Sequence, residues 1–267
     1  MTFQQRAPFV CAFCCPFIFF FIILAFAFYS GHVLAKACAQ TEIDEWVDLE
    51  YVIDGDTIHL KDGRSVRLIG VNAPELARKN RNAEPFAIES KKSLAKLLMT
   101  TKKIGLSYGQ EKLDRYLRTL AHVFLANGVN VQASQLQNGM AAHIIIPPNI
   151  RQQNCYAKHE KNARSKGLGI WSNARFQKTS SDKLSNQSKG FYFISGRVHE
   201  IKQNNKTIWL FTDEKFAFRI EKDDLPYFKK LRPFQLLGQK IAAKGWIFPY
   251  KNQLNMRIKH SAAIEIN

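Results

Sequence analysis

A series of short β-forming runs, separated by turn signals, sets narrow limits on the fold. Residues 46–53 are rich in β-formers, and residues 57–60 lead into Asp62-Gly63, a hairpin turn signal, after which residues 66–71 return. This pattern predicts three short antiparallel strands. In the rest of this part we expect two more strands, at 104–108 and 119–125. We also expect three helices, at 84–99, 131–137 and 154–165. The prediction is a mainly β domain with inserted helices, built on a five-stranded barrel of the oligonucleotide/oligosaccharide-binding (OB) type.

A polar stretch at 179–189, almost without apolar residues, predicts a linker over 176–189. It divides the chain into a first domain, 38–175, and a β-rich accessory domain, 190–267. In the second domain we expect a short helical piece at 224–230 and five strands, at 191–201, 207–211, 216–220, 240–248 and 255–259. These strands predict a second small β-barrel-like domain, for which an OB-like barrel is one interpretation.

The first forty residues contain a targeting segment. Residues 7–29 carry no charge, Arg6 precedes them, and the small-x-small triplet Ala35-Lys36-Ala37 is typical of a leader-peptidase site. We predict a signal peptide at 1–37 and a mature chain that begins at Cys38. Residues 7–29 are also long enough to be an uncleaved membrane anchor, and lipid modification of Cys38 is a third alternative. Each alternative exports the protein, to the periplasm or the medium after cleavage, or to the membrane as an anchored form.

The cysteines support export. Of five cysteines, three lie inside the leader, which leaves Cys38 and Cys155 in the mature chain. In an oxidising compartment these two are predicted to form one disulfide, and the alternative is a pair of free thiols.

Composition limits the partners. The net charge is +17, and 46% of the residues are hydrophobic, which excludes a disordered chain. An excess of positive charge in both parts favours a polyanion, either nucleic acid or an anionic membrane surface. No protein partner is predicted, and a monomer is expected.

A set of charged residues in the first domain indicates phosphodiester chemistry. Asp54 and Asp56 are two residues apart, so both carboxylates can face one side of an extended segment and offer hard oxygen ligands to Ca²⁺. Arg67 lies in an otherwise apolar strand, and Arg118 lies in a loop, so both guanidinium groups could bind one phosphate. Glu75, just after Pro74, could take a proton from an attacking water.

In their order along the chain these residues resemble the staphylococcal nuclease-like, or thermonuclease, family. The resemblance covers about 46–172 and rests on Asp54-Gly55-Asp56-Thr57, on residues 66–75 ending in Asn72-Ala73-Pro74-Glu75, on Asp114-Arg115-Tyr116-Leu117-Arg118 and on residues 167–171. It implies a calcium-dependent nuclease that cleaves DNA and RNA with little sequence preference and leaves 3′-phosphate ends.

The same resemblance implies roles for individual residues. In the calcium site, Asp56 would ligate the ion directly with Asp54 close behind it, and Asn72 and the carbonyl of Ala73 would complete the protein ligands. Glu75 would be the general base, and Arg67 and Arg118 would stabilise the transition state. Tyr116 would contact substrate phosphate, and we assign the adjacent Arg115 to substrate binding as well.

This chain departs from the family pattern at three positions. Asn72 replaces an Asp, which removes a negative charge and predicts weaker calcium binding. Leu117 stands where the family usually has Gly, and a turn that requires positive φ would strain Leu. Ala73 replaces Thr, which is a mild change. The alternative function is a catalytically weak module that binds nucleic acid, and a membrane-anchored structural protein is a third hypothesis.

Other charged and aromatic residues allow more than one interpretation. The run 244–251 could stack single-stranded bases between positive charges, or it could be a hairpin whose aromatic side chains alternate into the core. The basic run at 78–81 is placed to meet a phosphate backbone. His122, His143 and His159 lack ligand-like spacing and are expected to be structural, while His59 is on a strand that faces the site and is a candidate to assist it.

Overall fold

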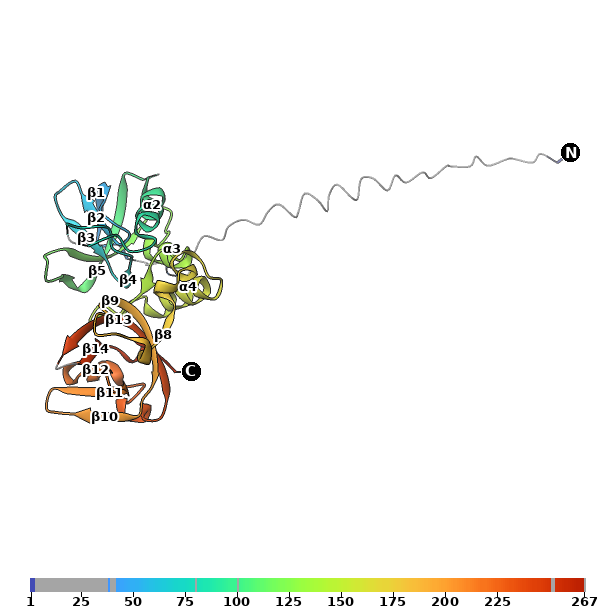
Figure 1. Cartoon of the computed structure of the whole chain (residues 1–267). Helices are drawn as coiled ribbons and strands as arrows, with labels where there is room; N and C mark the ends of the chain where they lie inside the picture. The colour runs from blue at the N-terminus through green and yellow to red at the C-terminus, as the bar shows by residue number, and fades with distance from the viewer. Residues whose placement is uncertain (3–37, 39–41, 80, 100, 251–252, 267) are drawn as a thin grey trace. The chain divides into compact units, whose positions relative to one another are not determined.

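The chain is described by a computed structural model that covers residues 1–2, 38, 42–79, 81–99, 101–250 and 253–266 (Figure 1). The predicted leader and the alternative anchor at 7–29 lie outside the described residues. Within the described part, none of the helices is both long and apolar enough to cross a membrane. The described residues from Cys38 onward belong to one compact unit.

The first part is a closed five-stranded barrel, as predicted. Its strands follow the order β1-β2-β3-β6-β5, and the parallel pairing of β3 with β6 closes it. Their bounds are Glu45–Val52 (β1), Thr57–Leu60 (β2), Ser65–Leu68 (β3), Lys103–Leu113 (β5) and Thr119–Phe124 (β6). Buried aliphatic side chains such as Ile58, Leu60 and Val66 fill the interior. Their burial accounts for the alternating pattern that the sequence shows.

Three helices cover the barrel: Ala87–Leu98 (α2), Val131–Gln137 (α3) and Gln153–Ser165 (α4). Helix α2 begins three residues later than expected, because Phe86 has a φ of 66° and cannot belong to a right-handed helix. A two-residue strand, Val71–Asn72 (β4), pairs with Ala142–His143 (β7) beside the barrel. This pairing holds residue 72 at the barrel surface.

A disulfide joins Cys38 to Cys155, the pair that the sequence analysis proposed. The Cα atoms are 5.8 Å apart, and the bond spans 117 residues. Asn130, the N-cap of α3, donates its side-chain N–H to the carbonyl of Cys38 at 3.3 Å. The beginning of the described body is therefore attached to both α3 and α4.

The second part is a β domain in the form of one eight-stranded sheet, rather than a five-stranded barrel. The order is β10-β11-β12-β14-β13-β9-β8, and β15 pairs with β13. The bounds are Lys178–Ser180 (β8), Gly190–Arg197 (β9), Glu200–Gln203 (β10), Thr207–Asp213 (β11), Phe216–Glu221 (β12), Lys240–Tyr250 (β13), Gln253–Arg257 (β14) and Ile264–Ile266 (β15). Strand β8 lies inside the segment predicted as a linker, where it pairs in parallel with β9.

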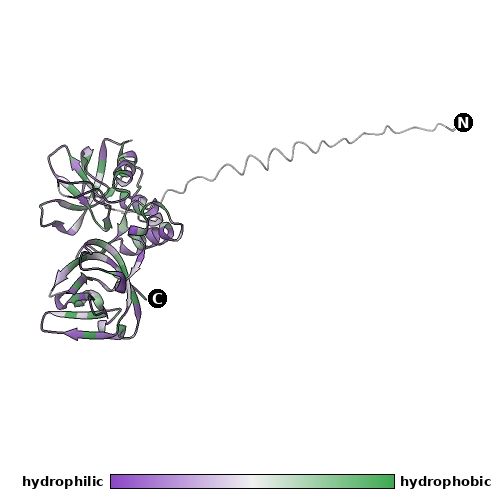
Figure 2. Ribbon diagram, viewed as in Figure 1, coloured by the Kyte–Doolittle hydropathy of each residue, from purple (hydrophilic) through white to green (hydrophobic). Residues whose placement is uncertain are grey.

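Each part has its own hydrophobic core, and a third cluster connects them. Figure 2 shows hydrophobic residues on the strands and helices of both parts, with hydrophilic residues on many of the hairpins. The third cluster packs Trp171 and Phe176 of the first part, with Ile144 and Ala163, against Phe191 of β9. The guanidinium of Arg175 also donates to the carbonyl of Phe191 at 2.6 Å. The second sheet therefore docks on the α4 side of the barrel. The boundaries given above for the two domains and the linker stay a prediction.

Candidate active site

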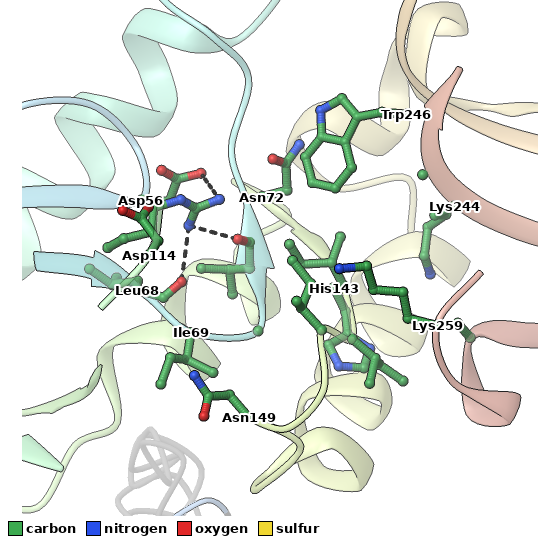
Figure 3. A pocket seen from close by; sticks show the side chains of 18 of the residues that line it. Asp56, Leu68, Ile69, Asn72, Asp114, His143, Asn149, Lys244, Trp246 and Lys259 are labelled. Carbon is green, nitrogen blue, oxygen red and sulfur yellow. Dashed lines mark hydrogen bonds and ion pairs between the residues drawn. The ribbon is translucent and has the colours of Figure 1, made fainter. Parts of the chain in front are cut away.

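A cavity of about 1310 Å³ contains all the charged side chains that the sequence analysis assigned to the active site. Figure 3 shows Asp56, Asn72 and Asp114 on one side of it and Lys244 and Lys259 on the other. The predicted residues that line it are Asp54, Asp56, Arg67, Asn72, Glu75, Arg115, Tyr116 and Arg118. Residues far apart in the sequence therefore meet at one place.

The loop after β1 places the two acidic residues. Asp54 Oδ1 accepts the backbone N–H of Asp56 at 3.1 Å, and Asp56 Oδ1 accepts the hydroxyl of Thr57 at 3.0 Å. Gly55 between them packs against α2, and a Cβ added there would lie 1.9 Å from Ser90 Oγ. The carbonyl of Gly55 accepts the side-chain N–H of Gln135 at 3.0 Å. The loop is thus held in one conformation by α2 and α3.

Asp56 is a buried carboxylate with a raised pKa. Only 6% of the residue is exposed, and this burial, with the nearby Asp54, raises the pKa of Asp56 to about 7. Arg67 and the backbone N–H of Ala73 act in the opposite direction. The N–H of Ala73 donates to Asp56 Oδ2 at 2.6 Å. The positive charge of Arg67 therefore helps to keep the carboxylate of Asp56 ionised.

Arg67 is fixed by three acceptors. Its Nη1 donates to the carbonyls of Leu68 at 2.9 Å and Val71 at 2.8 Å, and its Nη2 lies 3.1 Å from Asp56 Oδ2. Only 13% of the side chain is exposed, and Figure 3 draws these contacts as dashed lines. Nε donates to none of the described residues. A rigid guanidinium with one free edge is suited to a phosphate oxygen.

Asn72 and Ala73 follow on β4 and just beyond it. Asn72 is buried, yet its side chain has no hydrogen-bond partner among the described residues. The carbonyl of Ala73 likewise accepts no hydrogen bond from that part of the chain. These unpaired oxygens lie one and two residues beyond Val71, whose carbonyl binds Arg67.

Glu75 is held at the cavity edge by two arginines and by its backbone. Its Oε2 lies 2.8 Å from Arg81 Nη2 and 3.4 Å from Arg78 Nη2. The N–H of Glu75 donates to Glu84 Oε2 at 3.1 Å, and the N–H of Glu84 donates back to the carbonyl of Glu75 at 2.8 Å. Both arginines contact Oε2, so Oε1 remains free of partners within the described residues.

The loop after β5 carries Arg118, and Asp114 organises it. Asp114 Oδ1 accepts the N–H groups of Tyr116 at 2.9 Å and Arg118 at 3.0 Å, while Oδ2 binds the guanidinium of Arg118 at 2.7 and 2.8 Å. Burial alone would raise the pKa of Asp114, but these hydrogen bonds lower it overall. Asp114 therefore stays ionised and positions Arg118.

The same turn contains the strained residue that the sequence predicted. Leu117 has a φ of 61°, in the left-handed region that favours glycine, and 79% of it is exposed. Tyr116 is exposed beside it, where its hydroxyl accepts from Arg115 at 2.7 Å and its ring lies beneath the guanidinium groups of Arg115 and Arg118 at 4.8 and 5.5 Å. The three side chains form one basic, aromatic surface.

Comparisons with known proteins agree with this geometry. Residues 65–173 match the family model described as staphylococcal nuclease homologue. The chain is 33% identical over 154 residues to the thermonuclease of Staphylococcus intermedius, which covers 56% of this chain and 90% of that protein. The chain belongs to the staphylococcal nuclease family.

Two other relatives are similar to this chain over about half of its length. The thermonuclease of Staphylococcus hyicus is 35% identical over 125 residues, covering 46% of this chain and 73% of that protein. Endonuclease YncB of Bacillus subtilis (strain 168) is 31% identical over 135 residues, covering 49% of this chain and 63% of that protein. The relatives thus support a nuclease that hydrolyses phosphodiester bonds.

Among the described residues, His59, His122 and His159 do not form a second site. His122 Nδ1 lies 2.7 Å from the hydroxyl of Tyr156, and His59 lies between Ser65 and Glu50, at 3.2 and 3.5 Å. His159 lies near the sulfur atoms of Cys38 and Cys155, but those sulfurs are bonded to each other. None of these three lines the cavity, whereas His143 does.

Sequence reasoning missed part of this staphylococcal nuclease-like site. It gave no role to Asp114, although a carboxylate four residues before Arg118 is a signal for such pairing. The opposite side of the cavity is lined by residues of the second sheet, among them Lys244, Trp246, Arg257 and Lys259. The basic aromatic run 244–251 was the signal for that side, but its position depends on how β13 docks.

Proposed function

We propose that this protein is an exported, calcium-dependent endonuclease that hydrolyses DNA and RNA with little sequence preference and leaves 3′-phosphate ends. The thermonuclease and endonuclease relatives support the reaction class. The observation that carries the proposal is the convergence of Glu75, Arg67 and Arg118 with the acidic pair on one cavity. A surface that only binds nucleic acid has no need of a carboxylate that would repel phosphate.

The residues divide the chemistry between them. Arg67 has a free Nε–H and a fixed guanidinium, so it binds the scissile phosphate with little reorganisation. Arg118 shares its guanidinium between Asp114 and the developing charge on the phosphate. Glu75 Oε1 takes a proton from the attacking water, whose oxygen bonds to phosphorus. The bond from phosphorus to the 5′ oxygen breaks, and that oxygen takes up a proton.

The donor set fits calcium. Asp54 and Asp56, the side chain of Asn72 and the carbonyl of Ala73 offer hard oxygen atoms, and those of Asn72 and Ala73 have no partner among the described residues. We assign the cation to these four residues. When bound, it would neutralise phosphate charge. An Asn72→Asp variant should need about tenfold less calcium for half-maximal activity, because it restores a negative ligand; an unchanged requirement would contradict this assignment.

The disulfide supports export. A bond between Cys38 and Cys155 is stable in an oxidising compartment and rare in a reducing cytosol. Cys38 directly follows Ala35-Lys36-Ala37, so we propose cleavage after Ala37 and release to the periplasm or the medium, with membrane anchoring by 7–29 as the alternative. The mass of the protein recovered from an exporting host tests this, since an intact leader would reject cleavage.

The test of function is hydrolysis of single-stranded DNA, duplex DNA and RNA by the full chain, with Ca²⁺ or with chelator. We expect calcium-dependent cleavage that falls about 10²- to 10⁴-fold in Glu75→Gln. Glu89→Gln is the matched control, because Glu89 is exposed on α2 and does not line the cavity. Binding without cleavage at every calcium concentration would replace this proposal with the binding-module alternative.

A further inference from the structure

The second sheet supplies one wall of the active-site cavity, and this wall has its own chemistry. Lys244, Trp246 and Phe248 of β13 line it, together with Arg257 at the end of β14 and Lys259 just beyond. Figure 3 shows Lys244, Lys259 and Trp246 on the side opposite Asp56 and Asp114. None of these residues belongs to the matched family region, 65–173.

The wall is held firmly against the barrel by ion pairs. Lys244 pairs with Glu160 of α4 and lies 3.8 Å from Glu265 of β15, while Arg164 of α4 binds Glu265 at 2.7 Å. The side chains of Lys244 and Glu160 are almost fully buried. The charge of Lys244 is therefore already neutralised, and its role is to fix the wall in place.

Trp246 presents an aromatic ring to the cavity. Its neighbours on β13, Gly245 and Ile247, are buried, whereas 44% of Trp246 is exposed. The ring of Phe191 packs against it at 5.2 Å with an interplanar angle of 71°. An edge contact of this kind supports the indole from one side and leaves ring surface free for a stacking partner.

Lys259 presents an unneutralised cation to the same cavity. It is half-buried after Ile258, and no carboxylate of the described residues lies within ion-pair distance of its ammonium group. Burial and the adjacent Arg257 lower the pKa of Lys259, while Asp224 and Glu111 oppose this effect. Asp224 is engaged by Arg257 at 2.8 Å, and Arg115 of the barrel adds further positive charge near Lys259. An anion in the cavity would stabilise this lysine.

We propose that this wall binds a single-stranded polynucleotide, with a base stacked on Trp246 and a backbone phosphate on Lys259. The inference rests on the proposed function, because the same strand places its scissile phosphate at Arg67. A base can stack on an aromatic side chain only when it has left its own duplex stack. Arg67 is also recessed, with 13% of its side chain exposed, so a flexible strand reaches it more easily than a rigid duplex. The cavity of about 1310 Å³ exceeds the roughly 300–1,000 Å³ of pockets for drug-sized ligands.

The first test measures binding in chelator, where no cleavage occurs, by titrating the full chain with a labelled single-stranded oligonucleotide. Trp246→Ala should weaken binding about 5- to 150-fold, the effect of one lost base stack, and Trp246→Phe should restore most of it. Trp209→Ala, on β11 of the same sheet but away from the cavity, should bind like wild type. Equal affinities for wild type, Trp246→Ala and Trp209→Ala would overturn the stacking role.

The second test isolates the phosphate contact and the strand preference. Lys259→Gln should reduce the slope of log affinity against log salt by about 0.7, the value for one phosphate contact of a single strand, and Lys259→Arg should restore it. Lys229→Gln, exposed and outside the cavity, is the matched control. An unchanged slope in Lys259→Gln would overturn the phosphate contact. Equally tight binding of a blunt duplex of the same length would overturn single-strand selection.

Hydrolysis of a small aryl phosphodiester separates this inference from the proposed function. Such an ester carries a single phosphate and no flanking nucleotides, so Trp246→Ala and Lys259→Gln should lose much less activity on it than on the polymer. A large loss in these variants would contradict the wall as a binding surface. If wild type cleaves neither ester nor polymer, the proposed function fails, while the binding measurements still decide the inference.

Discussion

The groups that would meet substrate are held differently on the two walls of the cavity. On the barrel side the proposed catalytic groups are paired within the protein: Arg67 with Asp56, Arg118 with Asp114, and Glu75 with Arg81. On the sheet side, Lys259 has no carboxylate at ion-pair distance within the described residues, and Trp246 leaves much of its ring exposed. Paired groups are oriented in advance, which serves chemistry, whereas an unpaired cation and an open ring serve binding.

The largest effect is expected from removing the disulfide, which cross-links the barrel part but not the second sheet. A Cys38→Ser/Cys155→Ser double variant should lower the free energy of unfolding by about 2–5 kcal/mol, toward the upper end because the bond spans 117 residues. Hydrogen exchange should show the loss of protection in β6 and α3, while β11 and β12 retain theirs. Equal losses in both halves would show that the interface transmits the cross-link, and the comparison would fail.

A second prediction concerns how the free energy of unfolding depends on pH through two buried histidines of the barrel part. Burial, together with a smaller contribution from the nearby positive charge of Arg151 for His122 and of Lys244 for His143, lowers the pKa of each imidazole to about 3. Both imidazoles are neutral in the folded protein, so their contribution is fully present above pH 6.5 and declines as pH falls toward 3, because only the unfolded chain binds the protons. The unfolding free energy should fall by about 1.4 kcal/mol per pH unit for each histidine.

Urea unfolding between pH 7 and pH 5 measures this slope. His122→Gln should flatten it, whereas His199→Gln, at an exposed position of the second part, should leave it unchanged. Identical slopes for the two variants would contradict the assignment to the buried imidazoles.

A third prediction distinguishes a positioned arginine from a binding wall. Asp114→Asn keeps an oxygen for the N–H groups of Tyr116 and Arg118 but weakens the hold on the Arg118 guanidinium. We expect kcat for single-stranded DNA to fall about 10- to 100-fold with little change in KM, whereas Trp246→Ala should mainly raise KM. The reverse pattern would show that Asp114 serves substrate affinity.

The smallest expected effect concerns the strained turn. Leu117→Gly should raise the free energy of unfolding by about 0.5–1 kcal/mol, because glycine adopts a φ of 61° without strain and the exposed leucine side chain contributes little packing. Leu113→Gly, at the exposed last position of β5, should instead be destabilising. Thermal melts of both variants decide this, and a loss of stability in Leu117→Gly would show that the loop tolerates leucine.

The barrel and its charged residues were predictable because their signals are local. Residues 57–60 and 131–137 match β2 and α3 in full, and the turn at Asp62-Gly63 and the strain at Leu117 follow from single positions. The active-site residues carried their own motif, in which spacing alone brings Asp54 and Asp56 to one face. Local sequence therefore indicates most of the charged residues on the barrel side of the cavity.

The second wall was not predictable because it depends on pairing between distant segments. Strand β8 looks like a polar linker, and only its parallel pairing with β9 makes it a strand. The eight-stranded order follows from the parallel contact of β12 with β14, which no local pattern encodes. Lys259 carries no motif of its own, and it reaches the cavity through the ion pairs that dock β13 and β15 on α4.

The tight packing at Gly55 has a consequence for how this protein can be changed by design. Any side chain at position 55 would collide with Ser90, so a library that randomises the acidic loop would consist mostly of misfolded members. Positions 246 and 259, which border open space, can be randomised without disturbing that loop. Substrate preference and bond cleavage can thus be engineered at separate positions in the chain.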